Sequence, residues 1–429
     1  MRTFEIGLLG CGQIGSAVFS LLKRKARHLA REAGGVFKIV AVAVKRPRKS
    51  RPLRIPTSLF VSAEALVRDP RIDLVVELIG GTGAARKLVL AALKNGKDVV
   101  TANKALLAEH GDEIFSLAQN YGRQVFFEAS VGGGIPIIKT LREGLVANRI
   151  DSIHSIINGT SNYILSEMSE RHIDFKEALS LAQHKGYAEA DPTLDIEGTD
   201  AAHKLAILAR LAFGARFGFR EINCEGISQI QNEDIAFAEE FGYRIKLLAI
   251  AKRNRDGIEA RVEPALLPKN HILANVGGSF NAILLGGDEV GEILLYGKGA
   301  GPEPTASAVV SDLVDWARGL SAESHGRGHS SPTPVKIKSL STILSRYYLR
   351  FHVFDQPGVL SKISNILGRH RISISDVIQK ERKVGGVVPL ILLTHDSPEG
   401  RLRDAIRQID RLEVRKGKSQ VLRIEGELR

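Results

Sequence analysis

The chain has 429 residues, of which 44% are hydrophobic and 25% are charged, and its formal net charge is +12. A single core stops growing at roughly 250–300 residues, so two or three domains are expected. This composition excludes disordered and fibrous classes. The positive charge favours anionic partners, but the sequence lacks the basic-aromatic pattern of nucleic-acid binders.

Two cysteines, Cys11 and Cys224, stand far apart in the sequence. This spacing disfavours a disulfide framework or a cysteine-ligated metal and suits a reducing compartment. Glycines interrupt the first apolar run, unlike the core of a signal peptide, and no run approaches the ~18 apolar residues of a membrane span. We therefore expect a cytoplasmic protein that has no membrane partner.

The first 130 residues alternate strands with helices, which predicts a doubly wound, parallel, Rossmann-type sheet in an α/β fold. The strands are expected at 4–9, 36–44, 72–81, 98–104 and 124–130, and the helices at 16–30, 85–96 and 105–122.

Residues 131–304 mix helices with hairpins, which predicts an α+β substrate and dimerisation domain. A strand is expected at 150–158, helices at 162–185 and 198–214, and hairpins at 243–267 and 279–297; a helix at 305–320 would return to the first domain.

Residues 321–346 are rich in Ser, Gly, His and Pro at their start and are interpreted as a linker. Residues 347–429 then follow the order strand, helix, strand, strand, helix, strand. This order predicts a compact βαββαβ, ferredoxin-like domain.

The motif "GCGQIG" places Gly10, Gly12 and Gly15 between a strand and a helix. In a dinucleotide site the first glycine makes the turn, the second admits the pyrophosphate and the third lets the helix pack. The start of the helix at Gln13 and Ile14 would offer unpaired N–H groups to phosphate. The alternative, an ordinary glycine turn, does not explain the full context.

Lys45 and Arg46 stand where NAD enzymes carry an acid that binds the adenosine ribose. Cations at this position favour the 2′-phosphate of NADP. A solvated run of charges is the alternative interpretation, so NAD stays open.

Two further motifs could bear on the chemistry. Lys104, at the end of "TANK", follows a strand at the edge where such sheets bind ligands; its alternative is a surface cation. Glu128 precedes three glycines, and a carboxylate with exposed carbonyls suits a hard cation. That second segment could also be an interdomain hinge.

The stretch "GYAEADPTLDIEGTDAAHK" (186–204) gathers carboxylates ahead of Lys204. Asp200 and Lys204 are four residues apart and would share a helix face, as in an ordinary exposed pair worth about 0.2–0.5 kcal/mol. Alternatively, Glu189 and Asp200 would bind a substrate ammonium group while Lys204 protonates a polarised carbonyl. That acid role requires desolvation or a second cation such as Lys104 to lower the lysine pKa.

The ordered motifs "GxGxxG", "TANK", "EASVGGGIP", "NGTSNYIL", "GYAEADPTLDIEGTDAAHKLAIL" and "GKGAGPEPTASAVVSDL" resemble the homoserine dehydrogenase family over residues 1 to about 320. The resemblance implies NAD(P)H-dependent reduction of L-aspartate 4-semialdehyde to L-homoserine, on the route to threonine and methionine. It implies an acid–base role for Lys204 and Lys104, substrate binding by Glu189 and Asp200, and cofactor contact by Gly301. It also implies a sodium or similar ion held by Glu128 and the carbonyls of Val131, Gly133 and Ile135.

The tail "DQPGVLSKISNILGRHRISI" resembles an ACT domain, a module that binds amino acids. This resemblance implies feedback inhibition by L-threonine, with Asp355, Gly358 and Asn365 near the effector, and a homodimer or homotetramer. The alternative function is a catalytically idle amino-acid sensor. A dehydrogenase that oxidises aspartate semialdehyde would need a cysteine nucleophile, and neither cysteine of this chain fits that role.

Overall fold

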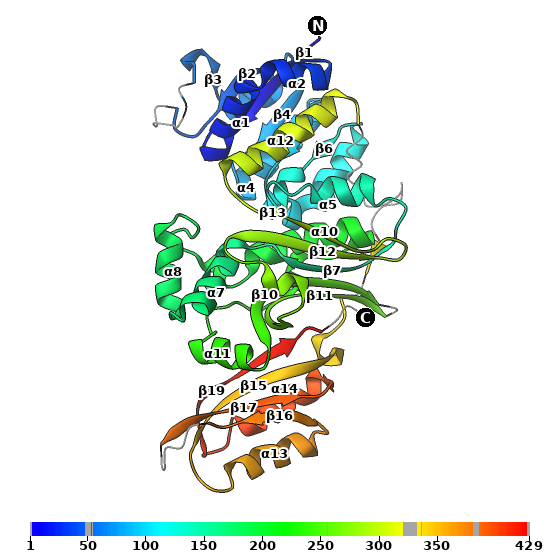
Figure 1. Ribbon diagram of the computed structural model, residues 1–429. Helices are drawn as coiled ribbons and strands as arrows, with labels where there is room; N and C mark the ends of the chain where they lie inside the picture. Colours follow the sequence, from blue (N-terminus) through cyan, green and yellow to red (C-terminus); the bar gives the residue numbers. More distant parts are fainter. Residues whose placement is uncertain are drawn as a thin grey trace. The chain divides into compact units, whose positions relative to one another are not determined.

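The computed structural model describes residues 2–47, 53, 55–254, 256–320, 333–335, 337–380 and 386–426 (Figure 1). The chain divides into two compact units, each described by itself. Unit 1 comprises Met1–Ile153, Asp200–Ile222 and Phe280–Val335, and unit 2 comprises His154–Thr199, Asn223–Ser279 and Lys336–Arg429. Each unit combines three separate segments of the chain and so does not correspond to one predicted domain. The predicted domain limits at residues 130, 304 and 346 therefore stay predictions.

Unit 1 contains a six-stranded sheet in the order β3-β2-β1-β4-β5-β6, in which every pairing is parallel. The strand order reverses beside β1, and such a switch point opens a crevice at the carboxyl ends of the strands. The Rossmann-type fold predicted from the alternating pattern is confirmed. The strands are β1 (Arg2–Leu9), β2 (Gly35–Ala43), β3 (Phe60–Val61), β4 (Leu74–Glu77), β5 (Asp98–Thr101) and β6 (Val125–Phe126).

Helix α12 (Pro302–Ala317) returns to this sheet, as predicted, and packs beside α1 and α2 (Figure 1). Val309 and Leu313 of α12 share a core with Val18 of α1 and with Ile6 and Leu8 of β1. Burial of these apolar faces anchors a helix that is distant in sequence. The other helices of the sheet are α1 (Gln13–Arg24), α2 (Ala26–Ala33), α3 (Ala63–Arg68), α4 (Gly83–Lys94) and α5 (Lys104–Asn120), with the short helix η1 (Thr57–Leu59).

The rest of unit 1 surrounds α10 (Thr199–Phe213) and the antiparallel hairpin of β12 (Phe280–Gly287) and β13 (Gly291–Lys298). Strand β7 (Ile150–Ile156) belongs to unit 1 up to Ile153 and to unit 2 beyond it. The predicted strand, helix and hairpin are thus confirmed. Shorter elements are η2 (Glu128–Ser130), α6 (Ile137–Lys139), the π-helix η3 (Thr140–Gly144), β8 (Ala215–Arg216), η4 (Phe219–Glu221) and β14 (Thr333–Pro334).

The first half of unit 2 contains the predicted hairpin of β10 (Tyr243–Asn254) and β11 (Gly257–Pro268). The helix predicted over 162–185 is instead two helices, because His172 adopts a left-handed conformation (φ 56°) and Asp174 caps the second helix by accepting the Glu177 N–H at 2.8 Å. The elements are α7 (Gly159–Arg171), α8 (Phe175–His184), α9 (Thr193–Ile196), β9 (Asn223–Cys224), α11 (Asn232–Glu240) and η5 (Ile272–Asn275).

The C-terminal part of unit 2 has the predicted βαββαβ order, with an antiparallel sheet β19-β15-β17-β16. Leu349, Phe351, Ile363 and Leu390 are among the fully buried residues of its core. The elements are η6 (Leu340–Thr342), β15 (Leu344–Phe354), α13 (Val359–Arg369), β16 (Ile374–Ile378), β17 (Val387–Thr394), β18 (Ser397–Pro398), α14 (Glu399–Ile409) and β19 (Arg415–Ile424).

The predicted linker is more structured than its composition indicates. Residues 321–332 and 336 lie outside the described part of the chain, but β14 pairs with β8 and Ile337 forms a bridge with Ile258. Backbone pairing of this kind needs no apolar period, which is why the side-chain pattern does not reveal it.

The C-terminal module joins the rest of unit 2 through strand pairing. Ala265 and Leu266 of β11 pair in parallel with Arg423 and Ile424 of β19. The module is therefore an extension of the β10–β11 sheet.

Among the helices that the structure describes, none is both long enough and apolar enough to cross a membrane.

Buried charges reinforce this seam. Glu259, Arg261 and Glu263 alternate on one face of β11, and Arg261, only 1% exposed, forms ion pairs with both glutamates and with Glu425 beyond β19. Arg423 of β19 in turn contacts Glu263 and Glu399. Each of these buried charges pairs with one of opposite sign. An unpaired ion at this depth would lower the stability of the fold.

We predict that Arg261→Met lowers the free energy of unfolding by about 3–5 kcal/mol, because it leaves three buried carboxylates without their shared cation. Urea denaturation followed by circular dichroism measures this loss. The matched control is Lys252→Met, which removes a 31% exposed partner of Glu425 and should cost about 1 kcal/mol or less. Equal losses in the two variants would contradict the prediction.

Candidate functional site

The glycine turn after β1 has the geometry of a phosphate site. A Cβ on Gly10 (φ +93°) would lie 2.6 Å from the Leu78 carbonyl oxygen, and one on Gly15 would lie 2.5 Å from the Gly10 carbonyl oxygen. No heavy atom lies within 4 Å of the corresponding point on Gly12. The first and third glycines thus permit close packing, while the second leaves room for a ligand.

Helix α1 begins at this turn with no acidic residue in its first turn and no side-chain cap at Gly12. Its first residues are Gln13 and Ile14, whose N–H groups have no partner within the helix. Phosphate groups of a dinucleotide fit such an N-terminus because of these N–H groups and the helix dipole. These residues could therefore hold the phosphates of the expected cofactor.

Lys45 and Arg46 lie just beyond the carboxyl end of β2, and both are exposed. They follow the strand whose end contacts the adenosine ribose in Rossmann-type folds. Their placement is compatible with a 2′-phosphate and leaves the choice of cofactor as a prediction.

Lys104 is the first residue of α5, directly after the capping residue Asn103. The Asn103 Oδ1 accepts the Leu106 N–H at 3.1 Å, which fixes the start of the helix. The N-terminus of a helix repels a cation, and the first turn of α5 contains no acid. Lys104 is therefore unfavourable for its own helix and needs a partner elsewhere.

That partner is Asp200, in the first turn of α10. Its Oδ1 lies 3.0 Å from the Lys104 Nζ, and its Oδ2 accepts a hydrogen bond from the Lys204 Nζ at 2.7 Å. One carboxylate thus bridges two ammonium groups. The structure brings together three of the predicted site residues within unit 1.

The trio differs in exposure. The side chains of Asp200 and Lys204 are 8% and 10% exposed, whereas that of Lys104 is 41% exposed. Burial alone would raise the pKa of Asp200, but the charges of Lys204 and Lys104 outweigh it and hold this pKa well below its ordinary value. Asp200 is therefore ionised at neutral pH, and the Lys204 side chain is largely excluded from water.

Glu189 lies in unit 2, exposed, in the loop between α8 and α9. Its carbonyl oxygen accepts the Gln183 side-chain amide at 3.2 Å. Its contribution to a site with Asp200 stays a prediction. Gly301 has a positive φ of 117° and caps the N-terminus of α12, so it presents another helix start within unit 1.

Glu128 is 6% exposed and binds the start of the next helix. Its two carboxylate oxygens accept the N–H groups of Ile138 and Lys139 at 2.9 and 2.8 Å. Burial raises the pKa of Glu128 to about 7. Asp312 accepts the Glu128 N–H at 3.0 Å, and burial together with the Glu128 charge raises the pKa of Asp312 well above its ordinary value.

The loop after Glu128 packs on a second glycine segment. A Cβ on Gly133 (φ +57°) would lie 2.5 Å from the Gly299 carbonyl oxygen, and the Gly134 N–H donates to the Lys298 carbonyl at 3.1 Å. In the described part of the chain no three His, Cys, Asp or Glu side chains form a metal-binding group. A cation here would depend on carbonyl oxygens, such as those of Val131, Gly133 and Ile135, beside one buried carboxylate.

The predicted effector residues lie on and before α13 of the C-terminal module. Gly358 (φ 89°) caps α13, Asn365 lies on that helix, and the Asp355 N–H donates to the Gly386 carbonyl at 2.9 Å. Their role in binding an effector stays a prediction.

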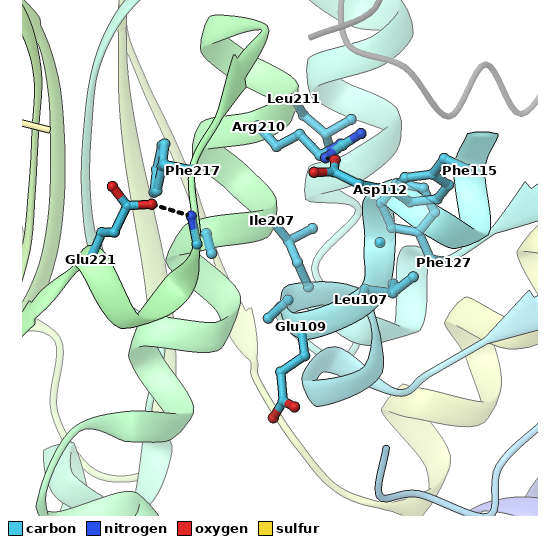
Figure 2. A pocket seen from close by; sticks show the side chains of 14 residues that line it. Leu107, Glu109, Asp112, Phe115, Phe127, Ile207, Arg210, Leu211, Phe217 and Glu221 are labelled. Carbon is cyan, nitrogen blue, oxygen red and sulfur yellow. Dashed lines mark hydrogen bonds and ion pairs between the residues drawn. The ribbon is translucent and has the colours of Figure 1, made fainter. Parts of the chain in front are cut away.

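A cavity of about 290 Å³ is lined by residues of α5 and α10 (Figure 2). Its wall combines apolar side chains such as Phe115, Phe127 and Ile207 with charged ones, and Arg210 forms an ion pair with Asp112. Figure 2 shows these two side chains facing each other while the Glu109 carboxylate points away. None of the trio lines this cavity, so it belongs to the packing of the two helices.

Sequence reasoning missed two buried polar residues near this site. Glu77, at the end of β4, is 0% exposed, and the only sequence signal is an acid that interrupts a run of apolar residues. The second is His203, which directly precedes Lys204. Its ring centroid lies 4.4 Å from that of Phe219, and burial lowers the pKa of His203. Its position on a helix of alanines and leucines gave no sequence signal of a functional residue.

Comparison with known proteins agrees with this geometry. The profile of the homoserine dehydrogenase NAD-binding domain matches residues 10–128, that of homoserine dehydrogenase matches residues 136–314, and that of the ACT domain matches residues 347–412. The homoserine dehydrogenase of Pseudomonas aeruginosa is 45% identical, and that of Neisseria gonorrhoeae 46%; in both, 99% of this chain and 99% of the relative are covered.

Solved structures give the same result. The crystal structure of a homoserine dehydrogenase from Thiobacillus denitrificans matches with a TM-score of 0.92 and 49% identity, covering 99% of each chain. That of S. aureus homoserine dehydrogenase matches with a TM-score of 0.77 and 32% identity, also over 99% of each chain. The glycine turn, the lysine–aspartate trio and these matches together show that the chain belongs to the homoserine dehydrogenase family and carries a C-terminal ACT domain.

Proposed function

We propose that this chain interconverts L-aspartate 4-semialdehyde and L-homoserine with a nicotinamide cofactor, in the synthesis of threonine and methionine. The observation that carries the proposal is the Asp200 carboxylate shared by the ammonium groups of Lys104 and Lys204. An aldehyde that accepts a hydride becomes an oxyanion, which requires a proton and nearby positive charge. Two lysines fixed by one acid can supply both.

The nicotinamide, when bound, supplies the hydride. Lys204 donates the proton to the substrate oxygen, since its ammonium group is held on one side by Asp200 and is shielded from water. Lys104 adds a second positive charge where the oxygen becomes negative. Asp200 keeps both ammonium groups in place and prevents their mutual repulsion.

Substrate binding would involve carboxylates. Glu189 is exposed on its loop and could accept the substrate ammonium group. Asp200 already pairs with two lysines. It would therefore bind the substrate through Oδ1, the oxygen that faces the more exposed Lys104. This division assigns recognition to Glu189 and orientation to Asp200.

The alternative function, a catalytically idle amino-acid sensor, does not account for the trio. Placing a lysine at the start of α5 is unfavourable for that helix, and a sensor would have no use for it. Incubation of the purified protein with homoserine and NADP, followed by absorbance of the reduced nicotinamide, separates the two functions.

Regulation by L-threonine is a further part of the proposal. The ACT domain supports an amino-acid effector; Asp355 and Gly358 lie just before α13, and Asn365 lies within that helix. Pairing of β19 with β11 supports transmission, since the domain is joined to the neighbouring sheet by backbone hydrogen bonds. We further propose that the protein acts as a homodimer or homotetramer in the cytoplasm.

A monovalent cation such as sodium is also proposed. Glu128 and Asp312 are buried acids in contact, and a cation bound by Glu128 and neighbouring carbonyl oxygens would compensate their charge. The expected ligands are the Glu128 side chain and the carbonyls of Val131, Gly133 and Ile135.

We predict that Lys204→Met lowers kcat by about 10²- to 10⁴-fold, the range for loss of general acid catalysis. The KM for homoserine should change little, because Glu189 carries recognition. Lys204→Arg, which keeps the charge but cannot release a proton at neutral pH, should be equally slow. Lys94→Met, at an exposed helix position, is the control, and near wild-type turnover in Lys204→Met would remove Lys204 from the mechanism.

NADP is the proposed cofactor, with NAD as the alternative. The exposed cations at Lys45 and Arg46 support it. A hyperthermophilic archaeal homoserine dehydrogenase solved in complex with NADPH is 25% identical over 73% of this chain, with a TM-score of 0.61. We predict that the double variant Lys45→Glu, Arg46→Glu raises the KM for NADPH about tenfold or more, because charge-assisted bonds to the 2′-phosphate are lost.

Initial rates with NADPH and NADH measure this preference. The KM for NADH should stay unchanged or fall, since NADH lacks the 2′-phosphate. Lys38→Glu, an exposed change within β2, controls for the general loss of positive charge. A parallel rise of both KM values in the double variant would refute the assignment of NADP.

The cation proposal predicts a pH-dependent effect of sodium on stability. The folded-state pKa of Glu128 is about 7 and its ordinary value is 4.5, so the folded protein binds more protons between these values. Without sodium, its stability relative to Glu128→Gln should therefore fall as pH rises from 4.5 to 7. Sodium needs the deprotonated carboxylate, so it should raise Tm more at pH 8 than at pH 5.

Differential scanning calorimetry in sodium chloride and in choline chloride at equal ionic strength tests this. Glu128→Gln should lose the pH-dependent response to sodium. The proposed site would be excluded by an equal response to sodium in the wild type and in this variant.

A further inference from the structure

Glu77 is a buried acid that the proposed mechanism does not use. It is the last residue of β4, at the edge of the sheet where the crevice opens, and it is 0% exposed. The preceding residues of this strand are the apolar Val75 and Val76, also fully buried. Among the described residues no cation forms an ion pair with Glu77. A carboxylate at such a position is costly, so packing alone does not explain it.

Three donors converge on this carboxylate. Its Oε1 accepts the N–H groups of Ile79 and Gly80 at 2.9 and 3.1 Å, and its Oε2 accepts the Thr101 hydroxyl at 2.7 Å. Glu77 therefore connects the loop after β4 to the end of β5. A carboxylate suits this place because both of its oxygens only accept.

The connection continues to Lys104. The Thr101 Oγ1 accepts the Asn103 N–H at 3.0 Å, and the Asn103 Nδ2 donates to the Gly81 carbonyl at 2.8 Å. Asn103 also caps α5, whose first residue is Lys104. The start of α5 is thus held from two sides by groups that Glu77 orders.

The same loop abuts the glycine turn. The Leu78 carbonyl oxygen lies 2.6 Å from the point that a Cβ on Gly10 would occupy. The Leu78 N–H donates to the Leu9 carbonyl at 2.7 Å. Displacement of the loop would therefore disturb the cofactor turn as well as Lys104. Glu77 lies between the two parts of the site that must face each other.

We propose that Glu77 is a positioning residue for the dehydrogenase reaction and that it acts through Thr101 and Asn103 on Lys104. The proposal rests on the function proposed above. Glu77 itself would not contact the substrate. Its loss would shift the Lys104 ammonium group relative to the substrate oxygen, and misplacement by about 1 Å can cost about a hundredfold in rate.

A double-mutant cycle of Glu77→Gln with Lys104→Met tests the proposal. The Gln amide offers one acceptor oxygen instead of two, so either Thr101 or the loop N–H groups lose their partner. Glu77→Gln should lower kcat about ten- to a hundredfold in the wild type and less than about twofold in Lys104→Met. Losses that multiply independently would overturn the proposal while leaving the role of Lys104 intact.

Lys104→Met measured alone separates the two claims. Wild-type turnover in that single variant would overturn the role of Lys104, and with it this proposal. If Glu77→Gln does not fold, Thr101→Val replaces it in the cycle, since it removes only the relay hydroxyl. Thr101→Ser keeps the hydroxyl and should restore kcat; failure to restore it would count against the relay.

Lys97→Met is the matched structural control. Lys97 is also buried, at 3% exposed, and its ammonium group donates to the Asp69 and Ile72 carbonyls at the opposite end of the same sheet. Its effect on kcat should be the same factor in the wild type and in Lys104→Met. If Lys97→Met showed the same non-additivity as Glu77→Gln, the coupling would be general destabilisation and the proposal would be wrong.

Discussion

The candidate site depends on one carboxylate, Asp200, which two ammonium groups share. Without it, Lys104 and Lys204 would place two positive charges on neighbouring helix starts in a partly dehydrated region, where repulsion is strong. Asp200 also suits its own helix, because an acid in the first turn of α10 interacts favourably with the helix dipole. The remaining net charge of the trio is a single positive one. That charge is available to an oxygen that becomes negative during hydride transfer, which explains why the arrangement fits reduction of an aldehyde.

The position of the trio follows from the order of the elements. β5 ends at Thr101 at the carboxyl edge of the sheet, and α5 begins three residues later, so Lys104 has almost no freedom to move away. Gly10 and Gly15 bring the glycine turn, the loop after β4 and the start of α1 into close packing on that edge. A rigid floor of this kind reduces the cost of aligning cofactor and substrate. Flexibility in the site is thus confined to the long lysine side chains, and ion pairs with Asp200 hold these in place.

Much of this could be predicted from the sequence, because the relevant signals are local. Alternating apolar runs gave the parallel sheet, and the i,i+4 spacing correctly placed Asp200 and Lys204 on one helix face. The pairing of Lys104 with Asp200 joins residues 96 positions apart; the sequence suggested Lys104 as a second cation near Lys204 but did not predict this ion pair. Glu77 went unnoticed because two of its partners are backbone N–H groups, which no residue type marks, and the third, Thr101, lies on a neighbouring strand. The break at His172 was missed for a similar reason, since one left-handed residue leaves the apolar period almost unchanged.

The seam between β11 and β19 combines strand pairing with buried ion pairs. Glu259, Arg261 and Glu263 occupy one face of β11, and their partners Arg423 and Glu425 belong to the end of the ACT domain. Ionic contacts depend steeply on distance in a region of low dielectric, so a small shift of β19 would change the balance of charge on β11. Apolar packing would tolerate the same shift more easily. Under the proposed regulation by threonine, a change in strand register or twist at β19 would reach β11 without a rigid-body movement of the domain. The composition of residues 321–346 indicated a linker and did not fix how firmly the module is coupled, whereas the strand pairing and the ion pairs join the module directly to β11.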